Sequence, residues 1–281
     1  MTAERSNTTL QQSAHAEMFR RELACGRQAL PQALHMVLAA FAACGFAVSG
    51  IHAWLLLRRG AGAFHRNALK IALWVGGCAA FLQPISGDYL AQRLARNQPV
   101  KLAAMEGQFQ TERGAPIRIG GIPNEDERRT AYAIEIPYGL SLLAFHDPNA
   151  EVRGLEAFER SDWPPVAIVH IAFQIMVAAG VTMMALAVAA IWKLSRHRLL
   201  DSKKFIRLLV WMSPIGFIAL EAGWVVTEVG RQPWIIQGVM RTAEAVTPVP
   251  GLIVPFFTFT LLYLFLAAVV AWLLVRQFRE T

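Results

Sequence analysis

The stretch VAIVHIAFQIMVAAGVTMMALAVAAIW, Val166–Trp192, contains no Asp, Glu, Lys or Arg. An apolar run of about 20 residues spans the hydrocarbon core of a bilayer as an α-helix, because a helix satisfies its own backbone hydrogen bonds there. Four further runs are free or nearly free of charged residues: Ala33–Leu57, Asn67–Ser86, Phe205–Thr227 and Gly251–Val275. The sequence therefore predicts an all-α fold class, a polytopic membrane helix bundle with five transmembrane helices.

The distribution of charge sets the orientation of these spans. Of the 281 residues only 17% are charged, against about a quarter in soluble domains, yet the net charge is +7. The basic residues gather in the short loops 58–66 and 193–207 and in the C-terminal tail. Short basic loops stay on the cytoplasmic side of a membrane. We therefore expect lipid, and no nucleic acid, to be the partner of this positive charge, and we expect the N-terminus to face outward.

The remaining chain divides around the spans. The loop from Gly87 to Asp162 carries nine Lys or Arg and twelve Asp or Glu, so it is not a retained basic loop and is predicted to be extracytoplasmic. Inside it, Pro99 suits the first position of a short helix that carries Lys101 and Glu106. The expected parts are a polar, poorly ordered or loosely helical segment 1–28, two spans in 29–86, the loop 87–162, and three spans in 163–281.

Two polar or sulfur-bearing residues stand out inside the spans. His35 lies near the start of the first span, and Met176 lies in the third, after His170 and Gln174. Imidazole and thioether are both axial ligands of haem iron. Taken alone, however, a membrane Met usually packs, and a His near a helix end is usually hydrogen bonded. His35 and Met176 also differ in predicted depth, so they meet only if the third helix begins above the bilayer or the first one tilts.

A pair of carboxylates marks the outer end of the fourth span. Glu228 follows Glu221 by two helical turns, and Arg231 follows Glu228 by one. One interpretation is a Glu228–Arg231 ion pair that anchors the helix end at the interface. The other is a carboxylate ligand or proton relay that faces the bundle interior. The residues themselves leave both open.

Four motifs carry a family resemblance. SGDYLAQRLARNQPVKLAAMEGQFQT, GIPNEDERRTAYAIEIPYGLSLLAFHDPN, AFQIMVAAG and EAGWVVTEVGRQPW together resemble subunit I of the cytochrome bd-type quinol oxidases. The resemblance runs in order from about Ala29 to Arg279. GRQPW after EAGW is the most specific of these motifs.

The resemblance implies roles for particular residues. His35 and Met176 match the axial ligands of the low-spin b-type haem, and Glu228 matches the ligand of the high-spin b-type haem. Lys101 and Glu106 match two loop residues that serve quinol oxidation, in which Glu106 accepts a proton and Lys101 hydrogen-bonds the quinol oxygen.

Two neighbours of Glu228 complete the expected site. Trp224 precedes Glu228 by four residues on the same face and is expected to pack against the macrocycle. Arg231 is expected to pair with a haem propionate or with Glu228 itself.

The resemblance also indicates which part of the family subunit this chain matches. The complete family subunit has nine helices, and this chain resembles its C-terminal portion, from near the fifth helix onward. The part before it carries the histidine ligand of the third haem, which is haem d or a further haem b. Gln174 stands where many members have Arg, and FQIM resembles the cyanide-insensitive branch. The implied partners are oxidase subunit II, ubiquinol or menaquinol, and an N-terminal part of subunit I.

The leading hypothesis is therefore a haem- and quinol-binding subunit, shorter than its family, of a quinol:oxygen oxidoreductase in the bacterial inner membrane, with its long loop on the periplasmic side. The alternative is a catalytically inactive membrane remnant or assembly partner of that complex. A small-solute transporter fits poorly, because the sequence has no pair of interrupted helices in symmetric positions.

Overall fold

The computed structural model describes the backbone of residues 2–59, 62–196 and 198–280, and the side chains of 29–58, 62–196 and 198–277. The chain divides into two compact units, Met1–Arg241 and Thr242–Thr281. The first unit holds the helix bundle and the long loop. The second holds the short 3-10 helix η3, Thr242–Ala245, and the helix α8, Ile253–Glu280.

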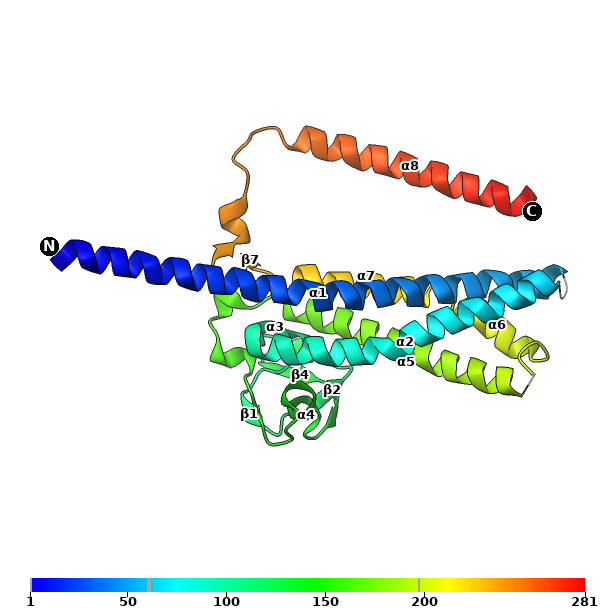
Figure 1. Ribbon diagram of the computed structural model, residues 1–281, viewed down its shortest axis with the longest axis horizontal. Coiled ribbons are helices and arrows are strands. Elements are labelled where there is room, and N and C mark those ends of the chain that lie inside the picture. The colour runs from blue at the N-terminus through cyan, green and yellow to red at the C-terminus, as the bar shows by residue number, and fades with distance from the viewer. Residues whose placement is uncertain (1, 60–61, 197, 281) are drawn as a thin grey trace. The chain divides into compact units, whose positions relative to one another are not determined.

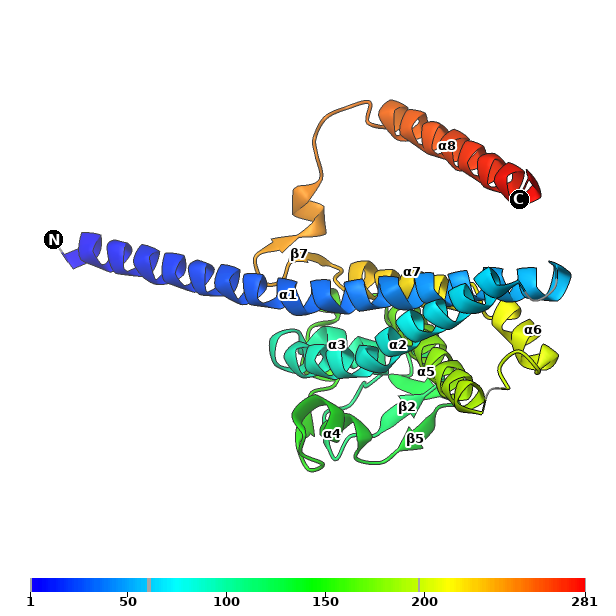
Figure 2. The same ribbon diagram turned by 45° about the vertical axis from the view of Figure 1, so that its right-hand side comes forward.

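Helices dominate the described residues, which confirms the predicted fold class. The bundle consists of α1 (Thr2–Arg59), α2 (Ala63–Asn97), α5 (Val166–Ser195), α6 (Lys203–Trp211) and α7 (Ile215–Val229), as Figures 1 and 2 show. Five segments are long and apolar enough to cross a membrane: Ala29–Arg58, Ala63–Asn97, Val166–Ser195, Lys203–Val229 and Ile253–Gln277. The last of them, in α8, has no Asp, Glu, Lys or Arg from Ile253 to Val275.

The fourth span differs from its prediction, because it is two helices. α6 ends at Trp211 and α7 begins at Ile215, with turns between them. Pro214 lacks a backbone N–H and restricts the residue before it to extended conformations, so the helix is interrupted there. The Ser202 side chain caps α6 by accepting a hydrogen bond from the Phe205 N–H at 3.4 Å.

Two helices are longer than the hydropathy pattern predicts. α1 runs without a break from Thr2 to Arg59, so the described backbone of residues 2–28 is helical. α2 continues past Ser86 to Asn97, so the first residues of the predicted loop, 87–97, are helical.

Small residues let the first two helices approach closely. A side-chain carbon added at Gly45 of α1 would lie 2.5 Å from the Cα of Gly76 on α2, so the backbones touch at this crossing. Phe46 of α1, Leu69 of α2 and Leu209 of α6 are fully buried and belong to one apolar core.

The long loop forms a small layer at the end of the bundle opposite α6 (Figure 1). Its elements are α3 (Pro99–Glu106), β1 (Glu112–Arg113), β2 (Ile117–Ile119), β3 (Ile122–Asn124), β4 (Arg129–Ala131), β5 (Ile134–Ile136), α4 (Gly139–Phe145), β6 (Glu151–Val152) and the 3-10 turns η1 (Leu155–Ala157) and η2 (Arg160–Asp162). The strands pair antiparallel as β1–β6, β2–β5 and β3–β4. After α7, a further hairpin joins β7 (Trp234–Ile236) to β8 (Met240–Arg241). The Arg241 guanidinium lies 2.6 Å from the Asp162 carboxylate, which ties this hairpin to the loop.

Candidate functional site

The short helix α3 is the centre of the candidate site. It begins at Pro99, as the sequence predicts, because Pro fits the first helical position and forces the preceding Gln98 out of the helix. It ends at Gly107, whose φ of 61° is the left-handed conformation that glycine adopts without strain. Leu102 and the alanines after it pack inward, so α3 is fixed on the bundle and presents Lys101 and Glu106 from a buried helix.

Glu106 is almost completely enclosed, with 2% of its surface exposed. Burial disfavours the ionised carboxylate and raises the pKa of Glu106 to about 7, while the positive charge of Arg118 acts in the opposite direction. A carboxyl group with a pKa near neutrality exists in both protonation states at pH 7. Glu106 can therefore accept and release a proton under ordinary conditions.

Lys101 reaches from α3 to the end of α7. Its ammonium group donates a hydrogen bond to the Thr227 carbonyl oxygen at 3.2 Å. Burial, together with repulsion from Arg231, lowers the pKa of Lys101 to about 8, and the attraction of Glu228 opposes both effects. Lys101 is five residues before Glu106, about 140° around the helix, so the two side chains leave α3 in different directions.

Gly230 of the GRQPW motif makes this contact possible. A side-chain carbon there would lie 2.4 Å from the Val226 carbonyl oxygen and 3.1 Å from Cε of Lys101. The motif therefore needs glycine at this position so that the lysine can lie along the end of α7.

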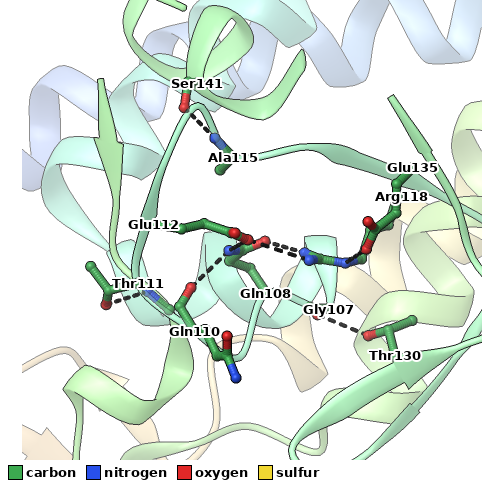
Figure 3. Close-up of polar contacts among 11 residues, drawn as sticks. Gly107, Gln108, Gln110, Thr111, Glu112, Ala115, Arg118, Thr130, Glu135 and Ser141 are labelled. Atoms are coloured by element: carbon green, nitrogen blue, oxygen red, sulfur yellow. Dashed lines mark hydrogen bonds and ion pairs between the residues drawn. The ribbon is translucent and has the colours of Figure 1, made fainter. Parts of the chain in front are cut away.

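A charged network follows the end of α3 in the loop and includes Gln108, Glu112, Arg118 and Glu135 (Figure 3). The Arg118 guanidinium donates to Oε1 of the fully buried Gln108, and it lies 3.4 Å from the Glu112 carboxylate and 3.0 Å from that of Glu135. Gln108 in turn donates to Glu112 at 2.6 Å. This network fixes Arg118, the cation that lowers the Glu106 pKa. Sequence reasoning did not single out Gln108 or Arg118, because no local pattern marks them.

The first turns of α5 pack against the loop. His170 Nδ1 lies 2.8 Å from the Met105 carbonyl oxygen, and Gln174 Nε2 donates to the Arg118 carbonyl oxygen at 2.8 Å. The start of α5 therefore lies against α3 and β2. That Met176 and His35 meet at one haem stays a prediction. The Met176 sulfur faces α7, where a carbon added at Gly223 would lie 3.1 Å away.

His35 lies half-buried on α1 beside the outer part of α2. Its Nδ1 is 2.7 Å from Ser86 Oγ, and the Ser86 hydroxyl donates to the Gln83 carbonyl oxygen at 2.9 Å. When the Ser86 hydroxyl donates to Gln83, His35 Nδ1 carries hydrogen and is the donor of the contact with Ser86. The lone pair of His35 is then on Nε2, the arrangement typical of a metal-binding histidine.

The end of α7 carries the third group of predicted residues. Glu228 accepts a hydrogen bond from Arg231 at 3.0 Å, so the ion pair that the spacing allows is present. Half of the Glu228 side chain is exposed, and Trp224 is 59% exposed on the same helical face. Within the described residues, this face of α7 is open.

The described bundle also has an apolar hollow of about 380 Å³ between α1 and α2, away from these side chains. It is lined by Leu38, Phe41, Trp74, Val75, Cys78, Ala79 and Leu82. None of these lining residues belongs to the candidate site.

Comparison with known proteins places this geometry in a family. The family model for cytochrome bd terminal oxidase subunit I matches residues 8–281. The chain belongs to this family. With its five apolar helices it is a membrane protein of the bd oxidase subunit I family.

Individual relatives agree with the family match. The chain is 36% identical over 255 residues to a putative cytochrome bd menaquinol oxidase subunit I of Bacillus subtilis, with 88% of this chain and 56% of the relative covered. It is 32% identical to the cytochrome bd ubiquinol oxidase subunit 1 of the same organism, with 88% and 55% covered. The bd oxidase structure from Geobacillus thermodenitrificans superimposes with a TM-score of 0.80 at 36% identity, over 89% of this chain and 58% of that one. The chain thus spans about half the length of the curated relatives it matches.

Proposed function

We propose that this chain is the haem- and quinol-binding part of a bd-type terminal oxidase, a quinol:oxygen oxidoreductase that passes electrons from quinol through b-type haems toward the reduction of oxygen to water. The observation that carries the proposal is Glu106, a carboxyl group enclosed at the end of α3 with a pKa of about 7. The same helix carries Lys101, which reaches the end of α7 beside Glu228.

The quinol step follows from these two side chains. A quinol loses two protons as it loses two electrons, so a base must lie at its hydroxyl group. Glu106 takes the proton on its carboxylate oxygen as general base. The Lys101 ammonium group donates a hydrogen bond to the quinol oxygen and stabilises the negative charge that develops on it. Ubiquinol and menaquinol both present the hydroxyl groups that this chemistry requires.

His35 and Met176 have the donor set for a low-spin b-type haem. His35 Nε2 carries the free lone pair because Nδ1 donates to Ser86, and Ser86 thereby fixes the ring. Met176 offers its sulfur opposite Gly223, where the lack of a side chain leaves room. A haem held by His and Met, when bound, supplies a one-electron acceptor of raised reduction potential.

Glu228 offers a carboxylate for a second, high-spin b-type haem on the open face of α7. Trp224 on that face provides an aromatic surface, and Arg231 balances the carboxylate charge. We further propose that the loop 87–162 lies on the periplasmic side, so that protons from Glu106 leave outward. Oxidase subunit II, membrane lipid and an N-terminal part of subunit I that holds the third haem, d or b, complete the assembly.

The first test examines the haem ligand. Membranes that contain the chain together with subunit II are expected to show a low-spin b band in the reduced-minus-oxidised spectrum. His35→Ala should remove this band while the protein still inserts, whereas His52→Ala on the same helix should retain it. A band that persists unchanged in His35→Ala shows that another residue is the ligand.

The second test examines activity. Oxygen uptake with a quinol substrate is measured for the chain with subunit II, with and without a fragment that supplies the unmatched part of the relatives. Uptake that requires the fragment supports the proposal. An intact b band without uptake in either combination would instead assign the chain as an inactive remnant or assembly partner.

A further inference from the structure

The two-stranded ribbon of β2 and β5 has one charged face and one apolar face. Directly opposite residues of an antiparallel pair lie on the same face, and successive residues of a strand alternate between the faces. Arg118 lies opposite Glu135, and their side chains form an ion pair at 3.0 Å. The other face of the ribbon carries the four isoleucines of the two strands, Ile117, Ile119, Ile134 and Ile136.

The charged face is the one that packs on the protein. The Arg118 side chain is only 13% exposed, and its guanidinium donates to the fully buried Gln108. Ile119, Ile134 and Ile136 are 48%, 68% and 48% exposed, so the apolar face is the outer one among the described residues. A ribbon that packs on a protein core in water has the opposite arrangement, with its apolar face inward. The outer face of this ribbon is therefore suited to apolar surroundings.

Two contacts with α5 fix the depth of the ribbon along the bundle. Gln174 donates to the Arg118 carbonyl oxygen at 2.8 Å and accepts from the N–H of Gly120, in the turn between β2 and β3, at 3.1 Å. The uncharged run of α5 ends at Trp192. About 20 helical residues cross the hydrocarbon core, so a core with one edge at Trp192 has its other edge close to Gln174. The ribbon, which Figure 2 shows beside α5, therefore meets this helix where the acyl chains end.

The composition of the outer face favours lipid over a second protein. Its exposed isoleucines offer no hydrogen-bond donor or acceptor, whereas protein interfaces combine apolar contacts with regular hydrogen bonds. Tyr132, two residues before Ile134, is 93% exposed, and tyrosine is enriched where a membrane meets water. The strand edges of the ribbon carry backbone groups that need water or headgroups as partners. The backbone therefore belongs at the level of the headgroups, with only the side chains in the acyl region.

We propose that the β2–β5 ribbon rests on the phospholipid bilayer beside α5, with Ile119, Ile134 and Ile136 among the outermost carbons of the acyl chains. Tyr132 lies at the level of the headgroups. The bilayer then holds the ribbon, and with it Arg118, against the rest of the loop. This docking rests on the membrane span α5 and on the register of the strands, and it does not depend on the proposed quinol chemistry.

A photoreactive side chain tests what the outer face contacts. Ile134→benzoylphenylalanine places a group that bonds to neighbouring C–H groups under ultraviolet light at the most exposed isoleucine of the ribbon. The complex with subunit II is reconstituted in vesicles of phosphatidylethanolamine and phosphatidylglycerol and irradiated. Mass spectrometry of the intact chains then measures what has been attached.

Glu127→benzoylphenylalanine, at an exposed carboxylate of the same loop, is the matched control. Two residues earlier, Glu125 accepts a hydrogen bond from the Val166 N–H at the start of α5 at 3.1 Å. Val166 is eight residues before Gln174, about 12 Å along the helix, so the control lies beyond the acyl chains.

We expect an adduct heavier by one phospholipid for the Ile134 variant and loss of this adduct for the Glu127 variant. Ile136→benzoylphenylalanine, on the same face, should give the lipid adduct as well, so the result does not depend on one variant. A bond from the Ile134 variant to subunit II, to a second copy or to any other protein chain overturns the proposal. Equal lipid adducts in the Ile134 and Glu127 variants overturn it too, as does the absence of an adduct in both isoleucine variants.

Discussion

The ammonium nitrogen of Lys101 lies 3.2 Å from the carbonyl oxygen of Thr227, one residue before Glu228. This contact joins the short loop helix α3 to the end of α7. The group proposed to bind quinol and the carboxylate proposed for the second haem therefore belong to one local structure. Glu228 and Arg231 act in opposite directions on the Lys101 pKa, so a substitution at the end of α7 is expected to change that pKa.

Glu106→Gln is expected to lower quinol-dependent oxygen uptake about 100-fold or more, because the amide retains the shape of the side chain but cannot accept a proton. The low-spin b band should be unchanged, since α3 still packs. Oxygen uptake and difference spectra on the same membranes measure both. Glu127→Gln, at an exposed carboxylate of the same loop, is the control. Equal activity in the two variants would exclude Glu106 as the base.

The pH dependence of kcat/KM for quinol should reflect the protonation of both Glu106 and Lys101. As pH rises through about 7, Glu106 loses its proton and becomes able to accept one from quinol. As pH rises through about 8, Lys101 loses its proton and no longer stabilises the quinol oxygen. We expect kcat/KM for quinol to rise through the first value and fall above the second. In Lys101→Arg the fall should move to higher pH, and a profile identical to that of the unaltered enzyme contradicts this assignment.

Gly230→Ala tests the contact between α3 and α7. The added carbon would overlap the Val226 carbonyl oxygen and press on the Lys101 side chain. We expect a loss of about 1–3 kcal/mol in the free energy of unfolding, together with a raised KM for quinol. Thermal unfolding in detergent and steady-state kinetics measure these two effects.

Gly180→Ala is the matched control for that experiment, because the space around Gly180 of α5 is open. It should leave both measurements unchanged or slightly raise the stability. If the two alanine variants behave alike, the close approach at Gly230 has no energetic consequence.

Ser86→Ala tests the orientation of His35. The substitution removes the acceptor of the Nδ1–H bond, so the ring loses its fixed tautomer and direction. Loss of such a partner typically lowers metal affinity about 10–100-fold, and we expect a matching loss of low-spin haem b on purification. Haem content per protein is the measurement. Ser195→Ala, at a serine that only bonds its own helix, should retain the full content.

Much of the architecture was predictable from local sequence. Hydropathy alone identified the five spans, because apolar length is a property of contiguous residues. Pro99 predicted the start of α3. The spacing of Glu228 and Arg231 allowed an ion pair but did not distinguish it from a ligand or relay role, and the structure shows the pair. The interruption at Pro214 was missed, because the run around it is apolar throughout and hydropathy does not register a missing N–H.

The sequence by itself determined that the chain is a membrane helix bundle with a charged outer loop, and its motifs pointed to the residues of the candidate site. Only the tertiary structure decided that Glu106 is enclosed, that Arg118 acts on it, and that His170 joins α3 to the β2–β3 turn. The physical reason is that burial and hydrogen bonding depend on segments that are far apart in the chain. His170 and Met105 are 65 positions apart in the sequence, and no periodicity in either segment indicates that they are in contact.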